Sequence, residues 1–295
     1  MADRVAERLR LGFLLCAIMS HPNSTPTLTL NDGYQMPQLG FGTFELSDEA
    51  VVPAVLKALE VGYRHIDTAK AYHNEAGVGR AVRESGLPRE EIFVTTKLWN
   101  TDHERAGEAL EESLERLGLD YVDLYLIHWP KLGLDKRVEA WAAMEQARAK
   151  GLIRSIGLSN FTPQFLSEIL KNGSVVPAAN QVEYHPTFQQ RETVAANAAA
   201  GVVTQAWSPL GQAKHLDNAV LGRIARETGR TVAQVVLRWH LQQGRVAIPK
   251  TATPARIAEN FAVTDFSLTP EQMAAIDALH SGNRLGPDPD LVQSF

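Results

Sequence analysis

The segment GYRHIDTAKAY, residues 62–72, decides the fold that we expect and suggests the chemistry. It begins as a strand, breaks after Asp67 at Thr68 and Ala69, and places Tyr72 five residues beyond the aspartate. A buried strand that ends on a carboxylate, with a phenol just beyond, is typical of the rim of an active site. The segment fits equally well an aspartate that caps a helix, with Tyr72 as a packing residue, because such caps are common. The rest of the chain has to separate these two interpretations.

On both sides of this segment, short apolar runs alternate with helical stretches. We predict barrel strands at 39–44, 64–67, 92–97, 123–128, 153–158, 180–183, 202–207 and 245–248. We predict helices at 48–61, 75–85, 101–117, 138–150, 163–170, 191–200, 218–228, 231–243 and 254–260. An Asp-Gly pair between the apolar runs 28–30 and 35–37 predicts an N-terminal hairpin. An extra helix at 270–279 and a Gly/Pro-rich tail at 281–295 complete the chain.

Eight strand–helix repeats with nearly continuous apolar strands indicate a parallel sheet that is covered by helices. The predicted fold is therefore an α/β (β/α)8 TIM barrel with an N-terminal β-hairpin and extra C-terminal helices. A doubly wound sheet is the competing fold, and it usually carries G-x-G-x-x-G after its first strand. Here that turn is Gly40-Phe41-Gly42-Thr43-Phe44, which lacks the third glycine.

Composition narrows the range of functions. The chain has 295 residues, a formal charge of -5 and 44% hydrophobic residues, which suits one barrel domain. The mildly acidic balance provides no basic face for nucleic acid. Cys16 is the only cysteine, so neither an internal disulfide nor a cysteine metal cluster is expected. We expect a cytoplasmic protein without a metal, whose partner is a small molecule.

The first residues need a separate interpretation. Residues 11–18, LGFLLCAI, follow three arginines and could be the apolar region of a secretory signal. Asp3 and Glu7 in the preceding segment, and the lack of a clear A-x-A site, argue against this. Eight apolar residues are also too few to span a bilayer. We interpret residues 1–26 as an N-terminal extension, disordered or not native to the protein, and residues 27–295 as the barrel domain.

Titratable side chains end three consecutive predicted strands. Asp67 ends the second, Lys97 the third and His128 the fourth. Lys97 alone could be a lysine extended along the rim, and His128 alone could be a core histidine. Because strand ends meet at one mouth of a barrel, three such residues beside Tyr72 favour a functional site.

Each of these side chains has a role in one reaction. A nearby Lys97 stabilises phenolate over phenol, which predicts that the pKa of Tyr72 falls below its usual value of about 10. Asp67 would hold the Lys97 ammonium in place. Tyr72 could then give a proton to a developing alkoxide or take one from an alcohol, and His128 could donate to the same oxygen. This arrangement predicts carbonyl reduction, which still needs a hydride source.

With these residues in place, the chain resembles the aldo-keto reductase family. The resemblance is carried by GYRHIDTAKAY, VTTKLW, LYLIHWP, SIGLSNF and IPKTATPARIAEN, in this order, and extends from Leu28 to the C-terminus. The overall string, which includes NQVEYHP and AWSPLGQ, is most similar to bacterial 2,5-diketo-D-gluconate reductase-like members. The resemblance implies that Asp67, Tyr72, Lys97 and His128 form a catalytic tetrad with the tyrosine as general acid.

The resemblance also implies NADPH, bound extended across the barrel mouth without a Rossmann turn. It assigns the nicotinamide carboxamide to Ser159, Asn160 and Gln181. It assigns the nicotinamide ring to Trp207, which could otherwise be a core residue at a strand end. It assigns the pyrophosphate to Ser208, Leu210 and Gln212 in the loop that follows.

The remaining coenzyme residues lie near the last strand. Lys250, Thr251 and Arg256 match the 2′-phosphate pocket, and Glu259 and Asn260 lie near the adenine. Two cations beside a hydroxyl suit a phosphate and favour NADP over NAD. Without the resemblance, Arg256 and Glu259 would be interpreted as a solvated pair on a helix.

Substrate residues are less clearly indicated. Phe44, Trp99 and Trp129 match the apolar walls of the family's pocket, with His128 beside them. The segment 131–135 is short where many animal members carry a long loop, which suggests an open pocket. The family's usual form is a monomer.

Two other functions remain to be compared. A metal-dependent barrel hydrolase is suggested by His65, Asp67, Lys97, His128 and His185, but such sites normally open with H-x-H on a first strand that here has no ligand. A non-catalytic NADP(H)-sensing subunit, similar to the potassium-channel β-subunits, would keep the coenzyme without turnover. The complete tetrad argues for an enzyme.

Overall fold

The computed structural model describes residues 25–130 and 136–292. The prediction of an N-terminal extension concerns residues 1–26, most of which lie outside these ranges. No helix in the described ranges is long and apolar enough to cross a membrane.

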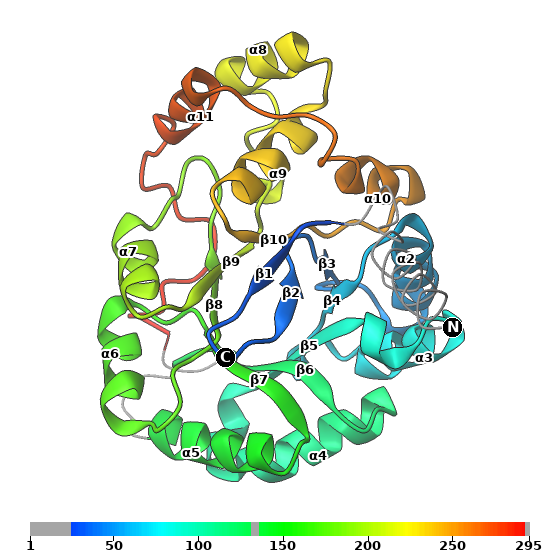
Figure 1. Ribbon diagram of the computed structural model, residues 1–295, viewed down its shortest axis with the longest axis vertical. Helices are drawn as coiled ribbons and strands as arrows, with labels where there is room; N and C mark the ends of the chain where they lie inside the picture. Colours follow the sequence, from blue (N-terminus) through cyan, green and yellow to red (C-terminus); the bar gives the residue numbers. More distant parts are fainter. Residues whose placement is uncertain (1–24, 131–135, 293–295) are drawn as a thin grey trace, which may run out of the picture.

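A parallel sheet of eight strands forms the centre of the described chain, in the order β3 to β10 (Figure 1). Its strands are β3 (Phe41–Gly42), β4 (His65–Asp67), β5 (Phe93–Leu98), β6 (Val122–Ile127), β7 (Ile153–Ser159), β8 (Ala179–Glu183), β9 (Val203–Trp207) and β10 (Val246–Ile248). Leu39 pairs in parallel with Ala247, and the Gly40 N–H donates to the Ala247 carbonyl at 2.9 Å. These contacts join the first strand to the last, so the predicted barrel is confirmed.

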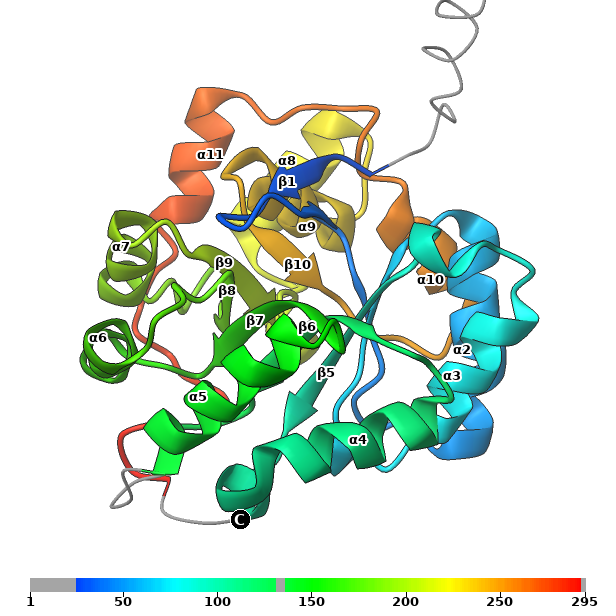
Figure 2. The same ribbon diagram turned by 60° about the horizontal axis from the view of Figure 1, so that its bottom comes forward.

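Helices surround this sheet, as Figures 1 and 2 show. They are α2 (Asp48–Val61), α3 (Glu75–Glu84), α4 (Ala106–Leu117), α5 (Lys136–Ala149), α6 (Pro163–Asn172), α7 (Arg191–Ala199), α8 (Ala219–Thr228), α9 (Val232–Gln242), α10 (Pro254–Phe261) and α11 (Pro270–Asp277).

Local signals set the helix ends. The Ser47 hydroxyl accepts the Ala50 N–H at 3.2 Å at the start of α2, and Gly62 ends that helix at φ 125°, which glycine adopts readily. The prediction for α4 was too long, because residues Asn100–Arg105 form a 3₁₀ helix, η3, before the α-helix begins at Ala106. Such tight turns are frequent at helix N-termini.

The predicted N-terminal hairpin is present as β1 (Thr27–Thr29) and β2 (Gln35–Pro37), which pair antiparallel. Leu30 and Met36 of this hairpin cluster with Phe93 and Val246, the first residues of β5 and β10. The hairpin therefore covers the end of the barrel at which the strands begin, and the site must open at the other end.

After α11, residues 281–292 form a tail that returns to the barrel. The Ser281 N–H donates to the Thr187 carbonyl at 3.0 Å, and the N–H groups of Leu285 and Gly286 reach the Glu183 carboxylate at the end of β8. The tail therefore lies at the mouth of the barrel, on the side of β8 and β9 (red in Figure 1).

Candidate active site

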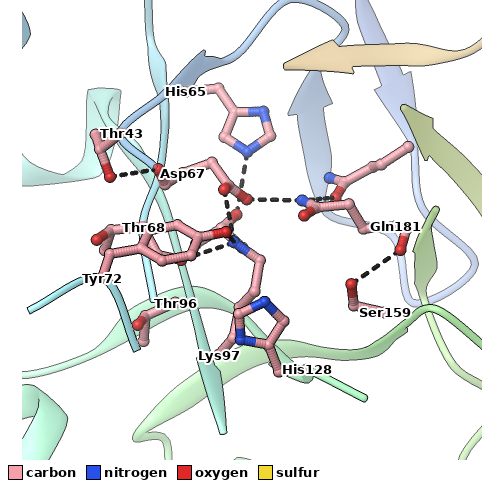
Figure 3. Close-up of polar contacts among 12 residues, drawn as sticks. Thr43, His65, Asp67, Thr68, Tyr72, Thr96, Lys97, His128, Ser159 and Gln181 are labelled. Carbon is pink, nitrogen blue, oxygen red and sulfur yellow. Dashed lines mark hydrogen bonds and ion pairs between the residues drawn. The ribbon is translucent and has the colours of Figure 1, made fainter. Parts of the chain in front are cut away.

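The four predicted tetrad residues lie at the ends of neighbouring strands. Asp67 is the last residue of β4, Lys97 lies near the end of β5, and His128 directly follows β6. Tyr72 ends a 3₁₀ turn, η1 (Lys70–Tyr72), that follows β4. Figure 3 shows their side chains gathered together, so the predicted convergence is present.

A buried asparagine fixes the turn that carries Tyr72. The Asn74 amide donates to the carbonyls of Thr43 and Leu46, both at 2.9 Å, and its oxygen accepts the Thr68 hydroxyl at 2.7 Å. Asn74 is fully buried, so these bonds are shielded from water. They tie the loop after β3 to the loop after β4 and hold Tyr72 over the barrel mouth.

Lys97 is the centre of the site. Its side chain is fully buried, and its ammonium donates to Asp67 Oδ1 at 2.6 Å and to the Thr68 carbonyl at 2.8 Å. Its third contact is the Tyr72 hydroxyl at 3.4 Å. The second Asp67 oxygen accepts the Gln181 amide at 2.7 Å, which connects β4 to β8 across the barrel. Each charge is thus paired and hydrogen-bonded, which a buried ion pair requires.

The predicted pKa shift of Tyr72 was wrong in sign. Burial raises the pKa of Tyr72, and the lowering by Lys97 does not overcome it because Asp67 acts in the opposite direction. Burial alone would lower the pKa of Lys97, but Asp67 and Tyr72 together raise it. Tyr72 is therefore a neutral phenol beside a fixed ammonium, which is the protonated form that an acid needs.

His128 lies on the other side of Tyr72. Burial and then the Lys97 charge hold the pKa of His128 well below its usual value, so the ring is neutral. Its ring centroid is 5.8 Å from that of Tyr72 and 5.1 Å from that of Trp99. Its Nδ1 has no hydrogen-bond partner among the residues that the structure describes. A neutral imidazole next to the phenol can donate one N–H to a bound oxygen.

The residues proposed for the nicotinamide carboxamide are hydrogen-bonded to one another beside the tetrad. The Ser159 hydroxyl donates to the Gln181 carbonyl at 2.9 Å, and the Asn160 amide donates to the His128 carbonyl at 2.9 Å. Trp207 Nε1 donates to Asn160 Oδ1 at 2.8 Å. Asn160 adopts φ 65°, a left-handed conformation that asparagine tolerates. The structure therefore brings these four residues into one cluster.

The loop after β9 has an unusual backbone. Ser208, Gln212 and Ala213 have φ values of 47°, 53° and 64°, and Gly211 has 56°. Left-handed conformations are costly for residues other than glycine and concentrate at functional sites. Successive N–H groups in such a loop can form a concave anion site, which fits the predicted pyrophosphate position for Ser208, Leu210 and Gln212.

The residues proposed for the 2′-phosphate lie before α10 and in its first turn, and those proposed for the adenine lie in its last turn. Arg256 is exposed and forms no salt bridge within the described ranges, while Lys250 lies 3.7 Å from Glu45. Thr251 Oγ1 accepts the Thr253 N–H at 3.1 Å. Glu259 accepts the Thr231 hydroxyl at 2.8 Å, and Asn260 is buried. Two cations near a helix N-terminus suit an anionic ligand.

The three proposed substrate walls differ in exposure. Phe44 is 56% exposed, with its ring 5.1 Å from that of Tyr72. Trp99 is partly exposed and contacts His128, whereas Trp129 is only 7% exposed. Residues 131–135, used above to expect an open pocket, lie outside the described ranges.

The metal-site alternative finds no support in the geometry. His65 Nε2 contacts the Thr95 hydroxyl at 3.0 Å, and His185 contacts Glu183 at 3.0 Å, so both histidines have partners away from the tetrad. In the parts of the chain that are described, no three His, Cys, Asp or Glu side chains lie close enough together to hold a metal ion.

Sequence reasoning missed two partners of the site. Gln205 accepts the second Gln181 N–H at 3.0 Å, and the Thr43 hydroxyl donates to the Asp67 carbonyl at 2.9 Å. Both lie on barrel strands or directly after one, where a polar residue could have signalled a contact in the barrel interior.

Comparison with known proteins agrees with this site. The model of the "Aldo/keto reductase family" matches residues 38–281. Methylglyoxal reductase DkgA of Escherichia coli (strain K12) is 51% identical over 270 residues, which cover 90% of this chain and 98% of that protein. An aldo/keto reductase structure from Brucella melitensis matches with TM-score 0.85 and 47% identity, over 87% of this chain and 100% of that one. A Bombyx mori aldo-keto reductase in complex with NADP matches with TM-score 0.86 and 38% identity, over 90% and 96%. The chain therefore belongs to the aldo/keto reductase family and is an oxidoreductase that acts on carbonyl groups.

Proposed function

We propose that this protein reduces aldehydes and ketones to alcohols with NADPH, and that Tyr72 is the general acid. One observation carries the proposal. The buried Lys97 ammonium contacts Asp67, the Thr68 carbonyl and the Tyr72 hydroxyl at the same time. A fixed cation beside a neutral phenol stabilises the phenolate only once the proton has left, which is the point at which catalysis needs it.

The residues present fit NADPH. When bound, this coenzyme supplies a hydride to the carbonyl carbon. Ser159, Asn160 and Gln181 would hold its carboxamide, Trp207 its ring, and Ser208, Leu210 and Gln212 its pyrophosphate. Lys250, Thr251 and Arg256 would hold the 2′-phosphate, with Glu259 and Asn260 near the adenine. The exposed Arg256 and the related silkworm enzyme with NADP support this assignment.

The side chains of the protein donate the proton and stabilise the charge that remains. Tyr72 gives its proton to the substrate oxygen, and the phenolate that remains is stabilised by Lys97. His128 donates an N–H to the same oxygen and sets the direction of the carbonyl. Asp67 keeps the ammonium charged and oriented, and Phe44, Trp99 and Trp129 give the reacting group apolar neighbours.

We propose small dicarbonyls and keto sugars, including 2,5-diketo-D-gluconate, as substrates. The name of the related methylglyoxal reductase supports a small dicarbonyl. The exposed Phe44 beside Tyr72 leaves the pocket open on one side. We further propose that the protein is a cytoplasmic monomer, for which a single molar mass in size-exclusion light scattering is the test.

The test is a panel of carbonyl substrates with NADPH and NADH side by side. Methylglyoxal, phenylglyoxal and 2,5-diketo-D-gluconate should each oxidise NADPH, and the Tyr72→Phe variant should bind NADPH without turnover. Binding of NADPH with no turnover of any carbonyl by the wild-type protein would contradict the proposal and favour a sensing subunit.

A further inference from the structure

A buried carboxylate with no role in the proposed reaction ends strand β8. The Glu183 side chain is fully shielded from solvent, and along the sheet Glu183 is paired with Trp207 of β9. A buried carboxylate is costly unless hydrogen bonds replace its water. Its partners therefore indicate what it is for.

The partners of Glu183 come mainly from the C-terminal tail. Its Oε1 accepts the Leu285 N–H at 2.6 Å, and its Oε2 accepts the Gly286 N–H at 2.8 Å. His185 Nε2 is the third partner, at 3.0 Å from Oε1. Within the described ranges no lysine or arginine forms an ion pair with this carboxylate. Burial would raise the pKa of Glu183, but these hydrogen bonds lower it, so the side chain is ionised at neutral pH.

The tail that Glu183 holds lies against Trp207. A Cβ atom added to Gly286 would lie 2.4 Å from Cη2 of the Trp207 ring, so the tail backbone contacts the edge of the indole directly. At its other end, the indole donates Nε1–H to Asn160 Oδ1 at 2.8 Å. Trp207 is therefore fixed between the tail and one of the proposed carboxamide residues.

The same carboxylate is also connected to the loop after β9. His185 Nδ1 lies 3.2 Å from the Thr187 hydroxyl, which lies 3.0 Å from His215 Nε2. If His185 Nε2–H donates to Glu183, the Thr187 hydroxyl can donate to Nδ1 and accept from His215, so each contact has one donor. His215 follows Leu210 and Gln212 on that loop.

We propose that Glu183 is a positioning residue that fastens the C-terminal tail over β9, so that Gly286 holds the Trp207 indole in place for the nicotinamide ring of NADPH. We name Glu183, Leu285, Gly286 and Trp207 the C-terminal clasp. Glu183 touches neither the tetrad nor a reacting atom, and acts through Trp207. The inference rests on the proposed function in placing the nicotinamide against Trp207.

Two variants test the clasp from opposite sides. Glu183→Gln replaces one acceptor oxygen by an NH2 group that faces a backbone N–H, which should release one end of the tail. Gly286→Ala keeps the carboxylate but pushes a methyl group into the indole. Each should weaken the binding of NADPH about tenfold in a fluorescence titration, because the first variant frees the indole and the second displaces it, and in both the ring loses its fixed position. The double variant should bind NADPH no more weakly than the single variant with the lower affinity, because both substitutions disrupt the same set of contacts.

Asp123→Asn is the matched control. Asp123 is also a buried carboxylate that accepts a backbone N–H, from Val94 at 2.9 Å, but it lies at the start of β6, at the far end of the barrel. This variant should lose thermal stability and bind NADPH as the wild type does.

The outcomes separate the clasp from the proposed function. Wild-type affinity for NADPH in both folded single variants would overturn the clasp, and so would additive losses in the double variant. If Glu183→Gln does not fold, Gly286→Ala alone decides, because it keeps the Glu183 carboxylate and acts mainly on the indole: the added Cβ atom would lie 2.4 Å from the Trp207 ring and 3.0 Å from Glu183 Oε2. Failure of the wild-type protein to reduce carbonyls would count against the proposed function, while the NADPH titrations would still decide the clasp.

Discussion

At the scale of single residues, the site depends on the competition for Tyr72 between burial and Lys97. Burial raises the pKa of the phenol and the ammonium opposes this, but the Asp67 carboxylate offsets part of the ammonium's effect. Tyr72 therefore keeps its proton through the neutral range. This suits the direction from carbonyl to alcohol better than the reverse.

This balance predicts the pH dependence of the two directions. Because burial raises the pKa of Tyr72 above its usual value, the acid form predominates throughout the neutral and mildly alkaline range. The rate of carbonyl reduction should stay level from about pH 6 to pH 9 and fall only above about pH 10. Alcohol oxidation needs the phenolate and should rise steadily over the same range. Initial rates in both directions, measured at constant ionic strength, check this.

The Tyr72→Phe variant is the control for this profile. It should lose about 10³-fold in reduction rate, because general acid catalysis contributes that order of magnitude, and any residual rate should not depend on pH in this way. A wild-type reduction rate that already halves near pH 7 would contradict the raised pKa.

Arg256 should decide between the two coenzymes. It is exposed and forms no salt bridge among the described residues, so its guanidinium is available for a 2′-phosphate. Arg256→Ala should weaken the binding of NADPH by about 2 kcal/mol, the value of a charge-assisted hydrogen bond, and leave the binding of NADH nearly unchanged. Dissociation constants of both coenzymes for the variant and the wild type check this. Equal losses for both would place the 2′-phosphate elsewhere.

At the scale of elements, the sequence predicted the order of the strands and helices but not how closely they approach. The alternation of apolar runs was sufficient for the barrel, because each strand must bury both of its faces. Tetrad positions followed from the rule that barrel chemistry lies at strand ends. The direction of the pKa shift of Tyr72 could not be predicted in this way, since it depends on how deeply Tyr72 is buried and on its distance from Asp67. Glu183 was missed because its partners come from a tail about a hundred residues later.

The contact between α3 and α4 gives a prediction for two helical glycines. A Cβ atom added to Gly79 would lie 1.7 Å from the Leu117 carbonyl oxygen, whereas one added to Gly107 would meet nothing within 4 Å. Gly79→Ala should destabilise the protein by about 2 kcal/mol, because α3 and α4 must move apart. Gly107→Ala should stabilise it by about 0.8 kcal/mol through helix propensity alone. Denaturant unfolding of both variants checks this, and equal effects would contradict the close approach.

At the scale of the whole molecule, bonds across the barrel hold the fold and the site together. The seam between β3 and β10 is closed by Gly40 and Ala247, and the interior is crossed by Gln181 and Asp67. Below them, His65 is fully buried between the Thr95 hydroxyl and the Pro37 carbonyl. Burial lowers the pKa of His65 to about 4.

This buried histidine predicts acid sensitivity of the barrel. Between pH 6.5 and 4, His65 is protonated in the unfolded chain but stays neutral in the folded protein. The free energy of unfolding therefore falls as the pH falls through this range. The full loss from this residue is about 3 kcal/mol. His65→Asn should be less stable at pH 7 but lose less between pH 7 and pH 4.5. The exposed His73, at φ 54°, gives a control in His73→Asn, which should keep the wild-type dependence. Equal slopes for all three proteins in denaturant titrations would contradict the assignment.

The N-terminal hairpin determines the end of the barrel through which reactants enter and leave. Because Leu30 and Met36 cover one end of the barrel, the coenzyme and the carbonyl must both enter at the other end. Ser159 and Gln181 lie deep in it, 0% and 2% exposed, while Phe44 stands at its outer edge. If the coenzyme occupies the deeper pair, as proposed above, it should enter first and leave last. In steady-state kinetics the oxidised coenzyme should then compete with NADPH but not with the carbonyl.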